Sequence, residues 1–377
     1  MENVLIVFGA FIISIMLGRI IIPNILIISM RKRLYDVPDA RKVHKQPIPR
    51  LGGVTFAPVV LFTFFCATAV RLELNNGPYG LFTINTAAEF LFMGAGLTLL
   101  YIIGIGDDLI GVKYKKKFVV QIISASLIPM SGLYINNLYG LLGIYEIPPV
   151  VGFPLTVLLV VFITNAINLI DGIDGLASGL CMVALVIFGV IFMHFGRWNY
   201  SILSFICCGV IIPFFAYNVY GIAEKGRKIF MGDTGSLTLG YLLSFFVLKY
   251  SMYNPNLEME SYGAPILISF SILLVPCLDV VRVVLRRAAN KQPLFLPDRS
   301  HIHHKFLDMG FGPRKAMLMI QIMSACFWIF TFVSIKYINI NLLFVLDILI
   351  WAGINLIIDK VIEKKKRCAL THKATSV

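Results

Sequence analysis

A segment of amides, carboxylates and glycines follows the apolar run 151–163: Asn165, Asn168, Asp171, Gly172, Asp174 and Gly175. Carboxylates at the end of a membrane helix cost several kcal/mol unless a cation or a polar ligand compensates for the lost water. The two glycines let the backbone turn tightly and approach such a ligand closely. An ordinary polar turn between two helices would use similar residues. The segment therefore predicts a ligand site only in combination with polar clusters elsewhere in the chain.

A second cluster combines an acidic pair with lysines. Asp107 and Asp108 follow an apolar run, and Lys113, Lys115 and Lys117 come shortly after them. Adjacent carboxylates repel each other, so one is protonated unless a cation lies beside them. Mg²⁺ removes this penalty, because it binds through one or two carboxylates together with substrate phosphates. A capped helix end is the alternative interpretation.

A third cluster, Phe230-Met-Gly-Asp233-Thr-Gly-Ser236, opens another apolar run. Free N–H groups at a helix N-terminus favour phosphate. An aspartate that only caps the helix would give a similar pattern. The cluster thus predicts either an anion site or a simple helix start.

Histidines form a fourth cluster in a basic segment, where Asp298 and Arg299 precede His301, His303 and His304. The combination indicates contact with phosphate or a nucleotide. Zinc is the competing interpretation, but the segment contains no cysteine, and the carboxylates elsewhere favour a hard cation. A plain surface cluster of histidines is the remaining alternative.

Two further groups are basic. In the segment 41–53, His44 and Lys45 are the candidates for binding phosphate, although an ordinary positively charged loop would look the same. Asp279, Arg282 and Arg286 share one helix face, for which we predict a structural ion pair rather than a catalytic role.

Composition defines the elements that must position these residues. The 377-residue chain is 58% hydrophobic and only 14% charged, whereas average proteins are about 45–50% apolar and about 25% charged. This excludes an ordinary soluble protein. The seven cysteines are odd in number and lie mostly within apolar runs, so they form no disulfide framework.

Eleven apolar runs are candidates for membrane spans, each near the roughly 20 residues that a bilayer requires. They cover about 3–28, 52–70, 87–105, 119–134, 150–166, 176–194, 199–217, 235–250, 264–284, 317–335 and 339–358. The first run lacks a basic n-region and a cleavage site, which favours a retained helix over a signal peptide.

The net charge of +13 is distributed unevenly. Most of the 33 Lys and Arg residues lie in alternate connections; the exceptions are Arg19, Arg71, Arg197, Lys249 and Lys336. Such asymmetry is typical of cytoplasmic loops and argues against a nucleic-acid-binding role. We therefore predict an all-α polytopic membrane protein with about eleven transmembrane helices, its N-terminus outside and its C-terminus in the cytoplasm.

The expected organisation is one transmembrane catalytic domain, 1–358, followed by a basic cytoplasmic tail, 359–377. The cytoplasmic loops that should form the site are 29–50, 106–118, 168–175, 218–234 and 281–316. All the polar clusters fall on these connections, at one face of the membrane. Acidic groups for a cation and basic groups for phosphates would together suit phosphoryl transfer, which depends mainly on positioning and charge neutralisation.

In this combination and order, the clusters resemble the polyprenyl-phosphate N-acetylhexosamine-1-phosphate transferases, glycosyltransferase family 4. The resemblance covers nearly the whole chain, and the His301-Ile-His303-His304 form is similar to the bacterial undecaprenyl-phosphate N-acetylglucosamine (GlcNAc)-1-phosphate branch. It implies a Mg²⁺-dependent enzyme, with Mn²⁺ as an alternative ion. The segment between Asn218 and Phe230 is longer and more basic than in the muramyl branch, which leaves the roles of 219–229 open.

The resemblance also implies roles for individual residues. Catalytic roles fall to Asp107, Asp108, Asp171 and His301. Metal binding falls to Asp233, Asp171 and Asp108. Substrate binding falls to His44, Lys45, Lys113, Lys115, Lys117, Asn168, Gly172, Asp174, Phe230, His303 and His304.

The implied reaction moves GlcNAc-1-phosphate from UDP-GlcNAc to undecaprenyl phosphate and releases UMP, the first membrane step of an envelope polysaccharide such as O-antigen, capsule or a teichoic-acid linkage unit. Direct attack by the lipid phosphate is the favoured route, and a covalent aspartyl intermediate is the minor one. Another UDP-N-acetylhexosamine, or UDP-MurNAc-pentapeptide, is an alternative donor. A transporter or flippase for an anionic substrate is the alternative from another class, although no internal repeat supports it. The implied location is the inner (plasma) membrane with a cytoplasmic site, and homodimer formation is left open.

Overall fold

Helices make up almost all of the computed structural model, which describes residues 2–36, 47–74, 84–252, 264–293 and 300–374. The helices are α1 (Glu2–Arg31), α2 (Phe56–Leu74), α3 (Ile84–Ile110), α4 (Tyr114–Met130), α5 (Pro149–Ile170), α6 (Leu176–His194), α7 (Trp198–Val219), α8 (Gly232–Ser251), α9 (Pro265–Ile272), α10 (Leu274–Ala289), α11 (Ile302–Asp308), α12 (Pro313–Ser334) and α13 (Ile340–Ala374). Short 3₁₀ helices cover Gly52–Thr55 (η1), Leu141–Gly143 (η2) and Ala223–Lys225 (η3).

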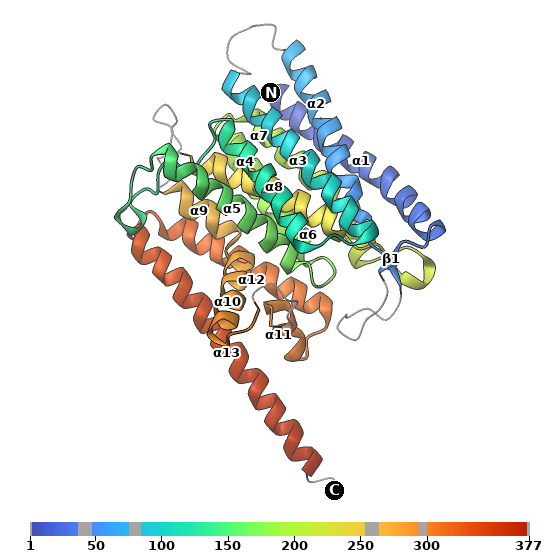
Figure 1. Cartoon of the computed structure of the whole chain (residues 1–377), viewed down its shortest axis with the longest axis vertical. Coiled ribbons are helices and arrows are strands. Elements are labelled where there is room, and N and C mark those ends of the chain that lie inside the picture. Colours follow the sequence, from blue (N-terminus) through green and yellow to red (C-terminus); the bar gives the residue numbers. More distant parts are fainter. Residues whose placement is uncertain (1, 37–46, 75–83, 253–263, 294–299, 375–377) are drawn as a thin grey trace.

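Helix α8 is the centre of the bundle. It packs against α3, α5 and α9, and its side chains are buried along almost the whole helix. Around it, α1 and α6 pack on α7, while α13 extends from the bundle toward the C-terminus (Figure 1). Because α8 is surrounded by protein rather than lipid, its polar first turn can carry site residues.

The all-α membrane architecture is confirmed. Among the described residues, eight helical segments are long and apolar enough to cross a membrane, or nine if the α9–α10 pair, bent by 78° at its break, is one span. The expected count of eleven is not confirmed. Helix α4 has only 17 residues, and α8 is a buried central helix with charged residues near both ends.

Several helices extend beyond the apolar runs seen in the sequence. Helix α3 continues to Ile110, so Asp107 and Asp108 lie in its last turn rather than in a loop. Helix α5 likewise continues to Ile170, which places Asn165 and Asn168 on the helix and only Asp171–Gly175 in the turn. The site loops are therefore shorter than the sequence suggests.

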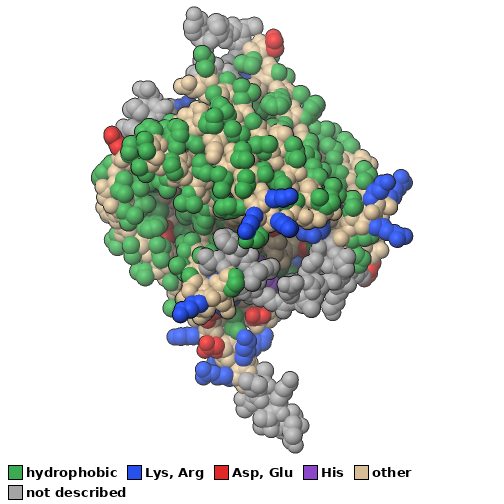
Figure 2. Space-filling model, viewed as in Figure 1, with side chains coloured by type: hydrophobic (Ala, Val, Ile, Leu, Met, Phe, Trp, Pro, Cys, Tyr) green, Lys and Arg blue, Asp and Glu red, His purple; other side chains and the backbone are tan. Residues whose placement is uncertain are grey.

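Hydrophobic side chains cover most of the face shown in Figure 2, and Lys and Arg side chains gather along its lower border and on the projecting part of α13. Lys249 lies outside the basic connections, and a buried ion pair explains how its charge is accommodated inside the bundle. Its ammonium group binds Glu89 at 2.7 Å and lies 4.8 Å from the ring centroid of Tyr200. Glu89, Tyr200 and Lys249 together join α3, α7 and α8. The ion pair between Glu89 and Lys249 compensates for the charges removed from water.

Between α1 and α2 the chain passes through a small two-stranded sheet, β1 (Tyr35–Asp36) and β2 (Ile48–Pro49), paired antiparallel with Tyr35 opposite Pro49. The chain after β2 then pairs with the start of α8: the amides of Gly52 and Gly53 donate to the carbonyls of Phe230 and Met231 at 2.9 and 2.8 Å. These bonds fix the segment before α8 against η1.

Candidate active site

The central contact of the site is an ion pair network between α3, α4 and α8. The Lys117 ammonium lies 3.1 Å from Asp107 Oδ2 and also contacts Asp233 Oδ2. The other oxygen of Asp107 accepts the Val112 amide at 2.6 Å, which fixes the end of α3. One lysine therefore binds two carboxylates that lie more than a hundred residues apart in the sequence.

Asp108 holds the first turn of α8. Its Oδ1 accepts the amide of Asp233 at 2.8 Å, and its Oδ2 accepts the amide and hydroxyl of Thr234 at 3.0 and 2.6 Å. The carboxylate thus satisfies the free N–H groups of a helix N-terminus, as a capping side chain does. The sequence assigned Asp108 to the metal and to catalysis. In the structure both of its oxygens accept hydrogen bonds from the first turn of α8, so Asp108 positions Asp233, and its metal-binding and catalytic roles stay predictions.

Asp171 ends α5 and lies in an acidic environment. Burial, followed by the negative charges of Asp174, Asp233 and Asp108, raises the pKa of this carboxyl to about 7. Such mutual repulsion identifies a place where an added cation would be strongly stabilised.

The two amides of the same segment fix α5 against its neighbours. Asn168 donates to Ser236 Oγ of α8 at 2.8 Å, and Asn165 donates to Gln121 Oε1 of α4 at 2.6 Å. Asn218 of α7 accepts the Gly175 amide at 2.7 Å and donates to the Ile229 carbonyl at 2.9 Å. Asn218 therefore joins the turn after α5 to the segment that precedes α8.

The histidine cluster meets the Asp171–Gly175 turn directly. The buried ring of His303 lies against Gly172, where even a methyl group would overlap it. Burial, followed by the positive charges of His304 and His301, lowers the pKa of His303 to about 3, so this imidazole is neutral. The rings of His301 and His303 are parallel, with centroids 5.9 Å apart. His304 is half-buried, and its ring centroid lies 4.3 Å from that of His303.

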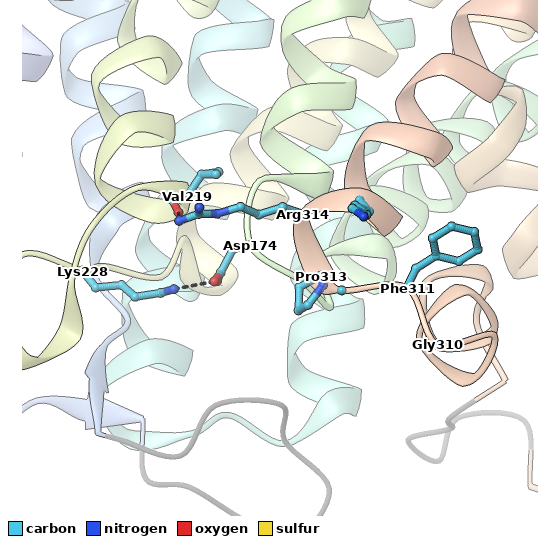
Figure 3. A pocket seen from close by; sticks show the side chains of 9 residues that line it. Asp174, Val219, Lys228, Gly310, Phe311, Pro313 and Arg314 are labelled. Atoms are coloured by element: carbon cyan, nitrogen blue, oxygen red, sulfur yellow. Dashed lines mark hydrogen bonds and ion pairs between the residues drawn. The ribbon is translucent and has the colours of Figure 1, made fainter.

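A cavity of about 770 Å³ opens beside this turn. It is lined by Asp174, Val219, Lys228, Gly310, Phe311, Gly312, Pro313, Arg314 and Lys315. Lys228 binds Asp174 at 2.5 Å, and Arg314 donates to the Val219 carbonyl at 3.1 Å across the same space (Figure 3). The size suits a nucleotide-sized ligand, and the basic groups suit an anionic one.

Some predicted residues lie apart from this centre. Lys113 and Lys115 are exposed, whereas Lys117 on the same helix points into the site. Their assignment as substrate ligands receives no support from these positions. Phe230 is half-buried, and its amide donates to the Pro49 carbonyl at 2.7 Å. His44 and Lys45 lie outside the described residues.

Within the described part of the chain, no three acidic, histidine or cysteine side chains converge as a ready metal cage. Asp171 and Asp233 nevertheless offer carboxylate oxygens in the same acidic region, next to the lysine that Asp233 holds. Mg²⁺ requires only one or two protein carboxylates when substrate phosphates complete its shell. The residues present therefore fit a substrate-completed magnesium site.

The sequence patterns assign no role in the site to three residues that lie near it: Lys228, Arg314 and Asp279. Lys228 lies in the segment whose role was left open, and Arg314 follows a Gly-Pro pair that only the fold brings beside Asp174. Asp279 was expected to pair with Arg282, which it does at 2.7 Å, but it also contacts His301 at 2.9 Å.

The chain is similar to known proteins over most of its length. Residues 90–251 match the model of Glycosyl transferase family 4. A probable undecaprenyl-phosphate N-acetylglucosaminyl 1-phosphate transferase of Bacillus subtilis is 35% identical, with 86% of this chain and 84% of the relative aligned.

More distant relatives have related names. A decaprenyl-phosphate N-acetylglucosaminephosphotransferase of Mycolicibacterium smegmatis is 31% identical over 78% of this chain and 74% of its own. An undecaprenyl-phosphate alpha-N-acetylglucosaminyl 1-phosphate transferase of Escherichia coli is 28% identical over 79% and 76%. The chain belongs to the polyprenyl-phosphate GlcNAc-1-phosphate transferases of glycosyl transferase family 4.

Proposed function

We propose that this protein transfers GlcNAc-1-phosphate from UDP-GlcNAc to undecaprenyl phosphate, giving undecaprenyl-pyrophosphoryl-GlcNAc and UMP. The observation that carries the proposal is the convergence of Asp107, Lys117 and Asp233 beside Asp171 and the basic cavity. The names of the relatives support the undecaprenyl phosphate acceptor and the transferred GlcNAc-1-phosphate. The proposed site faces the cytoplasm from the inner (plasma) membrane, as the basic border in Figure 2 and the charge pattern of the loops favour.

In the reaction, an oxygen of the lipid phosphate attacks the β-phosphorus of UDP-GlcNAc. The bond from this phosphorus to the bridging oxygen breaks, and UMP leaves with that oxygen. Asp107 is the proposed base for a protonated lipid phosphate, and Lys117 holds the Asp107 carboxylate in place. Mg²⁺, held by Asp233 and Asp171, would neutralise the diphosphate and stabilise the charge on the leaving UMP.

The basic cavity is the proposed donor pocket. Asp174, Lys228, Arg314 and Lys315 are among the residues that line it, and Lys228 pairs with Asp174 there (Figure 3). The uridine would bind beside Asp174, with the diphosphate directed toward Asp171 and the neutral ring of His303. A neutral imidazole can accept as well as donate a hydrogen bond, which suits a contact to sugar or phosphate groups.

The direct test uses the purified protein in detergent with Mg²⁺, undecaprenyl phosphate and radiolabelled UDP-GlcNAc. We expect label in the lipid phase with stoichiometric UMP, and neither product from Asp233→Asn, which should remain folded. A transporter would form no product in detergent. Absence of lipid-soluble label from wild-type protein, with a panel of UDP-sugars also tested, would refute the proposed reaction.

A separate experiment tests whether the transfer is direct or passes through a covalent intermediate. Exchange of labelled UMP into UDP-GlcNAc without lipid phosphate requires a covalent sugar-phosphate intermediate on the enzyme. Direct attack forbids this exchange, so we expect none.

A further inference from the structure

Asp279 of α10 is a fully buried carboxylate with three donor groups around it. Arg282 Nη2 lies 2.7 Å from Oδ1, and His301 Nδ1 lies 2.9 Å from Oδ2. The amide of Ile302 contacts Oδ1 and Oδ2 at 3.1 and 3.2 Å. The side chain has no exposed surface. Both oxygens of this carboxylate accept hydrogen bonds, and one of the donors is a guanidinium. Such contacts hold the carboxylate in its ionised form, which can only accept.

An ionised carboxylate at Nδ1 determines the tautomer of His301. Because Asp279 can only accept, the proton of a neutral His301 must lie on Nδ1, and Nε2 keeps its lone pair. The surroundings of His301 also restrict rotation of its ring. The side chain is buried, and its ring is parallel to the ring of His303, which lies against Gly172.

We propose that Asp279 is a positioning residue for the transfer reaction: it sets the tautomer and orientation of His301, so that Nε2 is presented to the phosphates of the donor. A proton taken up at Nε2 gives an imidazolium that Asp279 stabilises from the other side of the ring, and this group donates a hydrogen bond to a phosphate oxygen. The assignment rests on the proposed function.

A purely structural role would use the same contacts differently. Asp279 also caps the start of α11 through Ile302, and Arg282 contacts the Ser300 carbonyl, so the pair could serve only to hold this segment. The two roles predict different behaviour when His301 is absent. A positioning residue loses its effect without His301, whereas a structural residue does not.

A double-mutant cycle separates the two roles. In Asp279→Asn, one oxygen becomes an NH₂ group. When the remaining oxygen accepts from Arg282 and Ile302, the NH₂ group faces His301 and cannot accept its proton. We expect this variant to lose about 10- to 100-fold in kcat, as removal of partners that orient a functional histidine does. In the His301→Gln background the same change should cost no further activity. Independent, multiplicative losses would overturn the proposal.

The tautomer can be measured without any turnover. The chain has six histidines, and ¹⁵N-histidine labelling of the full-length protein in detergent gives resolvable ring signals. The His301 signal is the one missing from His301→Gln. At a pH near 8 we expect the wild type to show a protonated Nδ1 and a bare Nε2, and Asp279→Asn to show the reverse. A bare Nδ1 in the wild type would refute the inference.

The control variant is Asp347→Asn. Asp347 is another buried aspartate, on α13, and it accepts from Thr331 of α12 at 3.0 Å. It should change neither the His301 signal nor kcat. If Asp279→Asn does not fold, the wild-type signal alone decides. If the expected tautomer is found in a protein without transferase activity, the proposed function fails and the Asp279–His301 pairing stands.

Discussion

The imidazole of His303 lies against the backbone of Gly172, so the histidine segment before α12 and the turn after α5 share one surface of the site. Position 172 has no room for a side chain, and His303 is too buried to move away freely. This contact connects two motifs separated by more than a hundred residues. It explains why a glycine follows Asp171: any larger residue would displace the ring or the carboxylate.

Gly172→Ala should therefore impair catalysis more than folding. The added methyl group would shift His303 or Asp171 by a fraction of an ångström to about 1 Å, a displacement that can reduce turnover about 100-fold. Gly353→Ala in α13 is the matched control, because nothing lies near the position of its added methyl group. Steady-state kinetics with thermal unfolding checks this, and wild-type kcat in Gly172→Ala would contradict the packing described here.

Two lysines of α4 should behave differently. Lys117 binds Asp107 and Asp233, whereas Lys115 is exposed. Lys117→Gln leaves two carboxylates without their shared cation, so we expect a loss of at least about 100-fold in kcat, comparable to the loss of other electrostatic groups in active sites. Lys115→Gln should stay within about twofold, because isolated exposed charges contribute little. Equal losses in the two variants would show that the position of Lys117 is not decisive.

Asp108→Asn tests whether this carboxylate caps α8 rather than binding the metal. The amide group can accept at one oxygen only, so at least one of the contacts to Asp233 and Thr234 is lost. We expect a loss of about 1–2 kcal/mol in stability, typical of a lost cap, together with reduced turnover. Thermal unfolding of the detergent-purified variant measures the first effect. An inactive variant with unchanged stability would instead indicate that Asp108 acts in metal binding or catalysis.

Asp171 makes metal-free stability depend on pH. Since its pKa is raised to about 7 in the folded state, folding favours the protonated form. That contribution is complete below the ordinary pKa of an aspartate and is lost as the pH rises through about 7. We expect the Tm of the metal-free protein to fall between about pH 4 and about pH 7 and to level off above that, and Asp171→Asn to remove much of this fall.

Added Mg²⁺ should reverse the trend, because the metal takes the place of the proton. Its apparent affinity should accordingly rise with pH up to about 7 and level off above it. Titration of Mg²⁺ against Tm at several pH values measures this. A metal affinity that is the same at pH 6 and pH 8 would remove Asp171 from the site.

Much of this molecule follows from local sequence. The apolar runs predict the helices, because about 20 apolar residues have few other solutions in a bilayer. Asp107 and Asp171 were singled out because carboxylates beside such runs are costly without a ligand, whereas the roles of Asp233 and His301 came from the resemblance to a known family. The Asp279–Arg282 pair was also predicted, since i and i+3 residues of a helix are neighbours.

Tertiary packing decided what each of these residues does. Lys117 and Lys115 are equivalent by type, and only the rotation of α4 against α3 and α8 directs one inward. Asp107 and Asp108 are adjacent, yet one meets a lysine and the other meets the free N–H groups of α8. The contact of Asp279 with His301 required the residue that precedes α11 to lie beside α10. The sequence thus determined which groups need a partner, because desolvation acts on each residue locally. Only the packing of distant helices determined which partner each one has.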